Sequence, residues 1–192
     1  PISAPDSHSE TVGTEVTPEA APEVTGYTFS GWSKDDFTMP DEDVVITGSF
    51  TANKDTLYTI EYYTEDLGAD TYTLHSTDAS GRGQTDTVVD YSSKAKTITG
   101  FTYDNSKDAY VSRAVDGETV EDTVVETATI LGDGSLVIKL YYTRNSHKVT
   151  YNYTGTVPSG ASDLPAEATY EYGASVTVAA DATAPGYTFS GW

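Results

Sequence analysis

Gly26-Tyr27-Thr28-Phe29-Ser30-Gly31-Trp32 occurs a second time, without a change, at residues 186–192, and the two copies contain both tryptophans of the chain. A gap-free alignment of residues 1–32 with residues 161–192 extends the match beyond this heptamer. The further identities are Pro5/Pro165, Gly13/Gly173, Val16/Val176, Thr17/Thr177 and Ala20/Ala180. Because identity at a fixed spacing is the signature of a structural repeat, the heptamer marks the register of repeated modules.

The composition favours a β-rich and strongly acidic protein. Tyr is present in 15 copies, and Tyr, Thr and Val fit the pleated surface of a sheet. The chain has 30 acidic and 10 basic residues, and this net charge of −20 repels nucleic acid and anionic membranes. Lys and Arg are scattered singly, so the basic patch that a nucleic-acid reader needs is not visible. The absence of Cys excludes disulfides, thiolate metal sites and a Cys nucleophile.

Hydrophobic alternation divides the chain into three expected modules, residues 1–53, 54–146 and 147–192. No long apolar run at helical spacing interrupts them, and no stretch approaches the 18 or so apolar residues of a membrane span. We therefore expect a mainly β fold of small tandem modules, β-grasp-like, in an elongated array. Unit boundaries coincide with the polar linkers 51–56 and 143–146.

Short strands are predicted inside each module from the alternation of apolar and polar residues. The strongest signal is residues 136–142, where Leu, Ile, Leu and Tyr alternate with Val, Lys and Tyr. A closing strand is predicted over residues 44–50 and opening strands over 57–63 and 147–153. We predict a hairpin turn at residues 67–70, a tight turn at residues 132–134, and a loop at residues 80–84 because of its two glycines.

The first and third modules are each incomplete relative to the other. The first has no equivalent of residues 147–154, and the third has no equivalent of residues 33–53. An unpaired strand is an exposed edge that another chain could fill. We therefore expect neighbouring repeats or chains as partners, through edge-strand pairing at 147–154 or at the matching edge of the first module.

The heptamer is interpreted as a core plug. In a strand, Tyr27 and Phe29 point to one face and Trp32 to the other, where it caps a small core beside Gly31. Replacing Trp32 with Ala should then cost about 3–5 kcal/mol. The second copy places Tyr187, Phe189 and Trp192 in the same roles.

Two family resemblances cover most of the chain. The first and third modules resemble the Listeria–Bacteroides repeat (internalin B-repeat) family. The residues that carry this resemblance are Val149-Thr150-Tyr151, Tyr172-Gly173, Pro185 through Trp192, Gly26 through Trp32, Met39-Pro40 and Val44 through Phe50, although Thr25 replaces the usual Pro. The second module looks like a mucin-binding-protein-type domain, through Tyr58 to Tyr63, Gly100-Phe101 and Asp133 to Tyr142. Both resemblances imply β-grasp-like modules of bacterial cell-wall-anchored proteins, with no catalytic residue to carry over.

Several residue groups were weighed as sites. His8, His75 and His147 are far apart in sequence and are better explained as surface or linker residues. The acidic runs at 35–36 and 41–43 lack the alternating ligands and Gly of a calcium loop, so solvated loops are favoured. No nucleophile-elbow motif is present.

Two further groups have a functional and a structural interpretation. Lys139 could form an isopeptide bond with Asn145 or Asn152, but Lys139 and Lys148 are better explained as solvent-facing lysines that protect a sheet edge. Aromatic faces often stack on sugars, and the candidates for such a surface are Tyr63, Tyr141 and Tyr142. Ordinary sheet packing is the favoured alternative for these tyrosines.

The sequence thus predicts a non-catalytic spacer or stalk of a bacterial cell-surface adhesin or fibre, extracellular and at the cell surface or wall. It predicts no cofactor, no metal, no nucleic acid and no membrane insertion in this segment. The alternative is an adhesive module that binds mucin glycans or a host protein.

Overall fold

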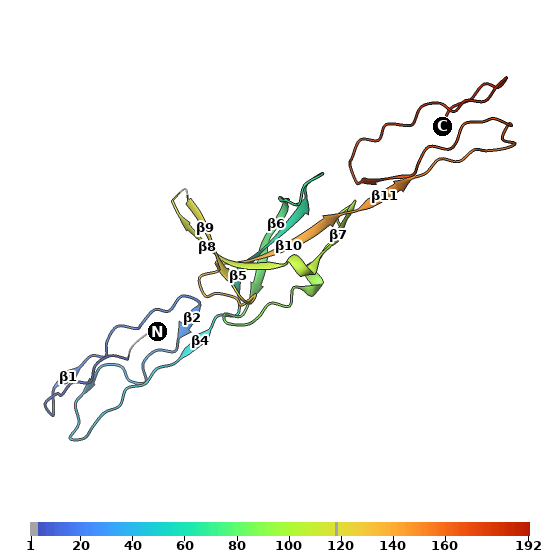
Figure 1. Cartoon of the computed structure of the whole chain (residues 1–192). Coiled ribbons are helices and arrows are strands. Elements are labelled where there is room, and N and C mark those ends of the chain that lie inside the picture. The colour runs from blue at the N-terminus through green and yellow to red at the C-terminus, as the bar shows by residue number, and fades with distance from the viewer. Residues whose placement is uncertain (1–3, 118) are drawn as a thin grey trace. The chain divides into compact units, whose positions relative to one another are not determined.

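The structure is a computed structural model that describes residues 4–117 and 119–192 (Figure 1). The prediction of a mainly β chain is confirmed. The strands are β1 Glu15–Val16, β2 Tyr27–Phe29, β3 Phe37–Thr38, β4 Phe50–Ala52, β5 Thr56–Glu65, β6 Tyr72–Gly83, β7 Phe101–Tyr103, β8 Ala109–Asp116, β9 Thr119–Val125, β10 Leu136–Arg144, β11 Ser146–Val149 and β12 Ala168–Glu171. Two 3₁₀ turns, η1 Ser92–Lys94 and η2 Asn105–Lys107, are also present. Within the described ranges, no helix has the length and apolar character needed to cross a bilayer.

The strands form one larger sheet and several two-stranded ladders. The larger sheet has the order β6-β5-β10-β8-β9, with β7 also paired to β10. The two-stranded ladders are β1-β3, β2-β4 and β11-β12. The chain divides into two compact units, which are described separately. The first comprises residues 1–61, 77–91 and 109–139, and the second comprises residues 62–76, 92–108 and 140–192.

In the first unit, the heptamer begins as strand β2, which pairs antiparallel with β4. Its turn differs from the expected one. Trp32 was expected on the face opposite Phe29, but its ring meets that of Phe29 edge-on, at 5.0 Å between centroids. The reason is Gly31, whose φ of +85° ends the extended conformation after β2 and brings Trp32 back to the side of Phe29.

The core of the first unit lies on the larger sheet. Buried apolar side chains come from β5, β8, β10 and the segments around residues 89 and 130. They are Tyr58, Ile60, Val89, Val111, Ala128, Ile130, Leu136, Val137 and Ile138. Strand β10 therefore begins with three consecutive buried residues, because both faces of the sheet are covered there.

In the second unit, the core continues along β10 and is formed by Tyr62, Ile98, Leu140 and Tyr142. The Tyr142 hydroxyl accepts a hydrogen bond from the backbone N–H of Lys96 at 2.9 Å, which satisfies the buried phenol. The opening strand of the third module, β11, pairs with β12. This internal pairing uses one side of residues 146–149, and the order of the two-stranded ladder leaves β11 at an edge of it, so pairing of this edge with another chain stays a prediction.

Two predicted elements differ in the structure, each for a physical reason. The closing strand is β4 at residues 50–52 and not 44–50. Thr47 and Ser49 accept backbone bonds from Ser33 and Ser30, at 2.7 and 2.8 Å, but their own N–H groups donate to the Oγ atoms of these serines, both at 2.9 Å, and so form no strand ladder. The loop predicted at residues 80–84 is the end of strand β6. A Cβ on Gly81 would meet the ring of Tyr58, so glycine here permits close packing rather than a turn. The hairpin turn predicted at residues 67–70, between the paired strands β5 and β6, and the tight turn predicted at residues 132–134 are present.

Candidate functional surfaces

The candidate aromatic surface is built on β5 and β10, in the second unit. Tyr63 and Tyr141 stack at 5.2 Å with an interplanar angle of 21°, and Tyr72 of β6 meets Tyr141 edge-on, also at 5.2 Å. All three side chains are half-buried. One face of the Tyr141 ring is therefore covered by Tyr63, and the ring also contacts Tyr72 edge-on. The structure brings two of the three candidate tyrosines together, but in a cluster whose rings pack on one another.

Tyr142 cannot serve as a ligand-facing residue. It is 1% exposed, and its ring contacts those of Tyr62 and Tyr103. Burial raises the pKa of its phenol above the usual value. The prediction was wrong for this residue because it did not follow the alternation along β10, which groups Tyr142 with the apolar residues of the strand. Leu140 and Tyr142 share the core face, and Tyr141 points away from it.

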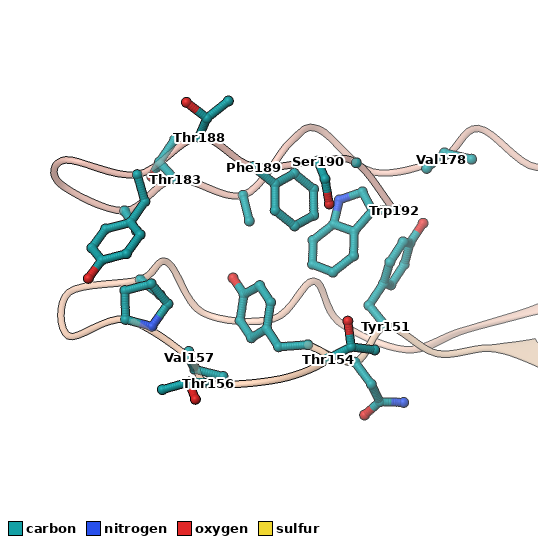
Figure 2. Close-up of a pocket in the computed structure, with 18 of the residues that line it drawn as sticks. Tyr151, Thr154, Thr156, Val157, Val178, Thr183, Thr188, Phe189, Ser190 and Trp192 are labelled. Carbon is teal, nitrogen blue, oxygen red and sulfur yellow. The ribbon is translucent and has the colours of Figure 1, made fainter.

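A cleft of about 610 Å³ lies within the third module (Figure 2). Its walls are aromatic, aliphatic and Thr side chains from residues 149–158 and 176–192. Figure 2 shows Phe189, Trp192 and Tyr151 beside one another at one end of this cleft. The Trp192 ring meets Tyr151 at 4.9 Å and Phe189 at 4.8 Å, and its indole N–H donates to the carbonyl of Ala180 at 2.9 Å. Sequence reasoning did not foresee this cleft.

The predicted core plugs have different environments in the two heptamers. Phe29, Trp32, Phe189 and Trp192 are half-buried and make the same edge-on Phe–Trp contact in both copies. Tyr27 is half-buried, and its hydroxyl donates to Asp86, which raises the pKa of the phenol. Tyr187 is 67% exposed and does not fill a core. The expectation of a core role is therefore wrong for Tyr187.

Lys139 belongs to a four-residue charge cluster in the first unit. Its Nζ lies 2.7 Å from Asp122 Oδ2, and Arg113 donates to Asp122 through Nε at 2.7 Å and Nη2 at 3.0 Å. The other side of the guanidinium binds Glu61, which is 4% exposed, through Nη1 and through Nη2 at 3.1 Å. Arg113 and then Lys139 hold the pKa of Asp122 well below its usual range, and the two carboxylates raise that of Arg113.

This cluster corrects the interpretation of Lys139 as a solvent-facing residue, since its side chain is 17% exposed. Lys148, by contrast, is 63% exposed and pairs with Glu167 at 2.6 Å, as expected of a surface lysine.

The remaining candidate chemistry is dispersed. His8 lies 3.6 Å from Glu10, and His75 contacts Ser76. In the part of the chain that the structure describes, no group of three or more His, Cys, Asp or Glu residues could hold a metal ion. The acidic runs at 35–36 and 41–43 are exposed.

Comparison with known protein families identifies a repeat domain at each end of the chain. The two end modules are small β units of the repeat type, which a shared aromatic heptamer relates. Residues 2–54 match the divergent InlB B-repeat domain, and residues 147–192 match the Listeria-Bacteroides repeat domain. Repeats of this kind are typical of bacterial surface or extracellular proteins. No curated protein and no solved structure matches the chain. Neither family match reaches the central segment, so its mucin-binding-protein resemblance stays a prediction.

Proposed function

We propose that this chain is a structural, non-catalytic spacer segment of a bacterial cell-surface adhesin or fibre. The observation that carries the proposal is the shortness of the connections between modules. β4 ends at Ala52 and β5 begins at Thr56, and only Asn145 separates β10 from β11. Connections of this length leave neighbouring modules little freedom to move relative to one another. The family matches at both ends support a surface location, and the acidic charge suits a segment that must stay soluble.

The proposed partners are neighbouring repeats or chains, through sheet edges. Strands β6 and β9 are the outer strands of the larger sheet, and β9 is exposed along almost its whole length. An edge strand offers unpaired backbone groups to another strand. Sedimentation velocity across a concentration series tests this partner class, since a species of constant mass at all concentrations would contradict it.

An adhesive module is the second candidate, and the cleft of the third module favours it. Its volume of about 610 Å³ and its aromatic and Thr lining lie in the usual range for sites that bind small ligands. Mucin glycans or a segment of a host protein would be the ligands, with the exposed Tyr187 ring at the cleft wall.

One experiment separates the two candidates. A binding domain of known target is displayed on a Gram-positive cell with this segment between the domain and the wall. The control cell carries a Gly/Ser linker with the same number of residues. A spacer should let the domain capture its target under flow better than the flexible linker does, while the segment alone captures no mucin. Capture of mucin by the segment alone, lost in Tyr187→Ala or Tyr141→Ala, would instead establish the adhesive function.

A further inference from the structure

The same short strand pairs with the last strand of two modules that are otherwise unlike. The pattern Gly-aromatic-Thr-aromatic is found at residues 26–29 and at residues 100–103. In both places the strand pairs antiparallel with the last strand of its module, β2 with β4 and β7 with β10. These closing strands also share a pattern, aromatic-Thr-x-Asn, at residues 50–53 and 142–145. The Asn is in each case the first residue after the strand.

Each Asn is held by its own module through two hydrogen bonds. The backbone N–H of Asn53 donates to the carbonyl of Gly26 at 2.9 Å, and Thr28 Oγ1 donates to Asn53 Oδ1 at 2.7 Å. Asn145 repeats both bonds, with Gly100 at 2.9 Å and with Thr102 at 2.6 Å. The conserved geometry fixes the backbone and the side chain of the residue that leaves the module.

The carbonyl of the same Asn receives the following module. Asn53 accepts from the backbone N–H of Thr85 at 2.9 Å, and Asn145 accepts from that of Tyr172 at 2.7 Å. Both donors lie just after a strand of the next module, β6 or β12. Each Asn therefore connects two modules through three hydrogen bonds, two on one side and one on the other.

The glycine of the pattern lets the next module approach. Gly26 and Gly100 have φ of +84° and +82°, and an added Cβ would collide with the following module in both cases. At Gly26 it would lie 2.9 Å from Thr85 Oγ1 and against the backbone of Gly132, and at Gly100 it would enter the Tyr172 ring. The aromatic residue that follows each glycine also reaches across. Tyr27 donates to Asp86, and the Phe101 ring meets Tyr172 edge-on at 6.0 Å.

We propose that these two patterns together form a coupling site that holds a turn of the following module in one orientation, with Asn53 and Asn145 as its positioning residues. This site fits the end of a strand in the following module. The residue just after that strand donates its backbone N–H to the Asn carbonyl, and a side chain there packs against the glycine. The proposal concerns how modules are held and does not depend on the spacer function.

The third copy of the sequence pattern, at residues 186–189, is not a strand and provides an internal control. Gly186 has a similar φ of +77°, but an added Cβ there meets nothing within 4 Å. Gly186→Ala and Gly26→Ala therefore carry the same backbone strain, and they differ in the contact with a following module. Asn152, an exposed Asn in the third module, is the matched control for the two coupling residues.

Spin labels measure the orientation directly, because the chain has no Cys and labelled pairs can be introduced freely. Val45 and Val88 are 76% and 66% exposed and report on the first coupling site within the first unit. Leu74 and Val178, 46% and 61% exposed, report on the second coupling site within the second unit. Pulsed electron–electron distance measurements then give the width of each distance distribution in the full chain.

Asn53→Ala should widen the distribution of the Val45/Val88 pair about twofold, because modules without a fixed interface move relative to one another. Asn145→Ala should do the same for the Leu74/Val178 pair only. Gly26→Ala should widen its own pair more than Gly186→Ala does, and Asn152→Ala should leave both pairs unchanged. Unchanged widths in Asn53→Ala and Asn145→Ala, or an equal effect of Asn152→Ala, would overturn the proposal.

Circular dichroism tests whether a wider distance distribution results from loss of folding. If Asn53→Ala no longer folds, Thr28→Val removes only the hydroxyl that binds the Asn side chain, and it should widen the same pair with an unchanged spectrum. A folded Thr28→Val variant with the original width would also refute the coupling site.

Discussion

The charge cluster of the first unit leads to the sharpest stability prediction, for Arg113→Met. Methionine keeps the aliphatic stem but removes the guanidinium, so the packing along β8 is largely preserved. What is lost is the guanidinium that binds both carboxylate oxygens of Glu61, a residue that is 4% exposed. The substitution therefore leaves a carboxylate in a place where water cannot solvate it.

The size of the effect follows from the burial of each partner. Removing one member of a buried ion pair costs about 3–5 kcal/mol, because the remaining charge loses its counter-charge in a place of low polarity. The Asp122 side of the cluster contributes less, since that side chain is 27% exposed and keeps Lys139 at 2.7 Å. We therefore expect a loss of about 3–5 kcal/mol in the free energy of opening of this part of the sheet, almost all of it from Glu61.

Native-state hydrogen exchange is the assay that suits a chain of several modules, because it reports local opening. The amide of Arg113 donates to the Ser135 carbonyl at 2.8 Å and is the direct probe. In the double variant Glu61→Gln with Arg113→Met, the buried charge is gone, and protection should recover part of the loss. Lys148→Met, which breaks an exposed pair, should leave protection unchanged. A loss in Arg113→Met no greater than in Lys148→Met, or a double variant less stable than the single one, contradicts the reasoning.

Two further predictions concern the heptamer and acid stability. Trp32→Ala should cost about 3 kcal/mol, the lower end for a large aromatic, because Trp32 is only half-buried; thermal unfolding followed by circular dichroism measures it, and a loss below about 1 kcal/mol contradicts a core role. Asp122 has a folded-state pKa below its unfolded one, so its stabilisation is present above about pH 4 and fades as the pH falls through the lowered pKa. The urea midpoints at pH 7 and pH 3 should therefore differ less in Asp122→Asn than in the original chain. Equal differences would show that Asp122 does not contribute to the loss of stability in acid.

Much of the β architecture could be predicted from local pattern. The alternation over residues 136–142 identified β10, whose side chains at 136, 138, 140 and 142 are at most 1% exposed. The limit of this reasoning is that alternation assigns two faces and does not say whether the second is also covered. Val137 is 3% exposed because the sheet is covered on both faces at that point, and only the fold contains this information.

Glycine was the least reliable signal. At Gly31 the positive φ turns the chain and moves Trp32 to the side of Phe29. At Gly81 glycine lies within a strand and makes room for the Tyr58 ring. Both residues are glycine in the sequence, and their roles differ because of the backbone conformation and the side chains around them. A single sequence does not contain this information.

The charge cluster was beyond sequence reasoning for a related reason. Arg113 and Glu61 are 52 residues apart, and nothing local connects them. Arg113 and Asp122 are cross-strand partners in the β8–β9 hairpin, so their pairing could be predicted once the turn near Gly117 is recognised. Of the three tyrosines of the candidate aromatic surface, Tyr142 is buried in the core, and a ligand-facing role of Tyr63 and Tyr141 stays a prediction.

The coupling site shows what a short repeated pattern can mean when its register is known. The first and central modules differ in length and in strand order, yet both close with an aromatic-Thr-x-Asn strand that pairs with a Gly-aromatic-Thr-aromatic strand. A contact made mainly by backbone groups and by one Asn depends little on the side chains of the module that follows, and here it receives Thr85 in one case and Tyr172 in the other. Modules of different sequence can therefore alternate along one chain without a new interface for each pair. It follows that the heptamer, which fills a core through Phe29 and Trp32, connects modules through Gly26 and Thr28.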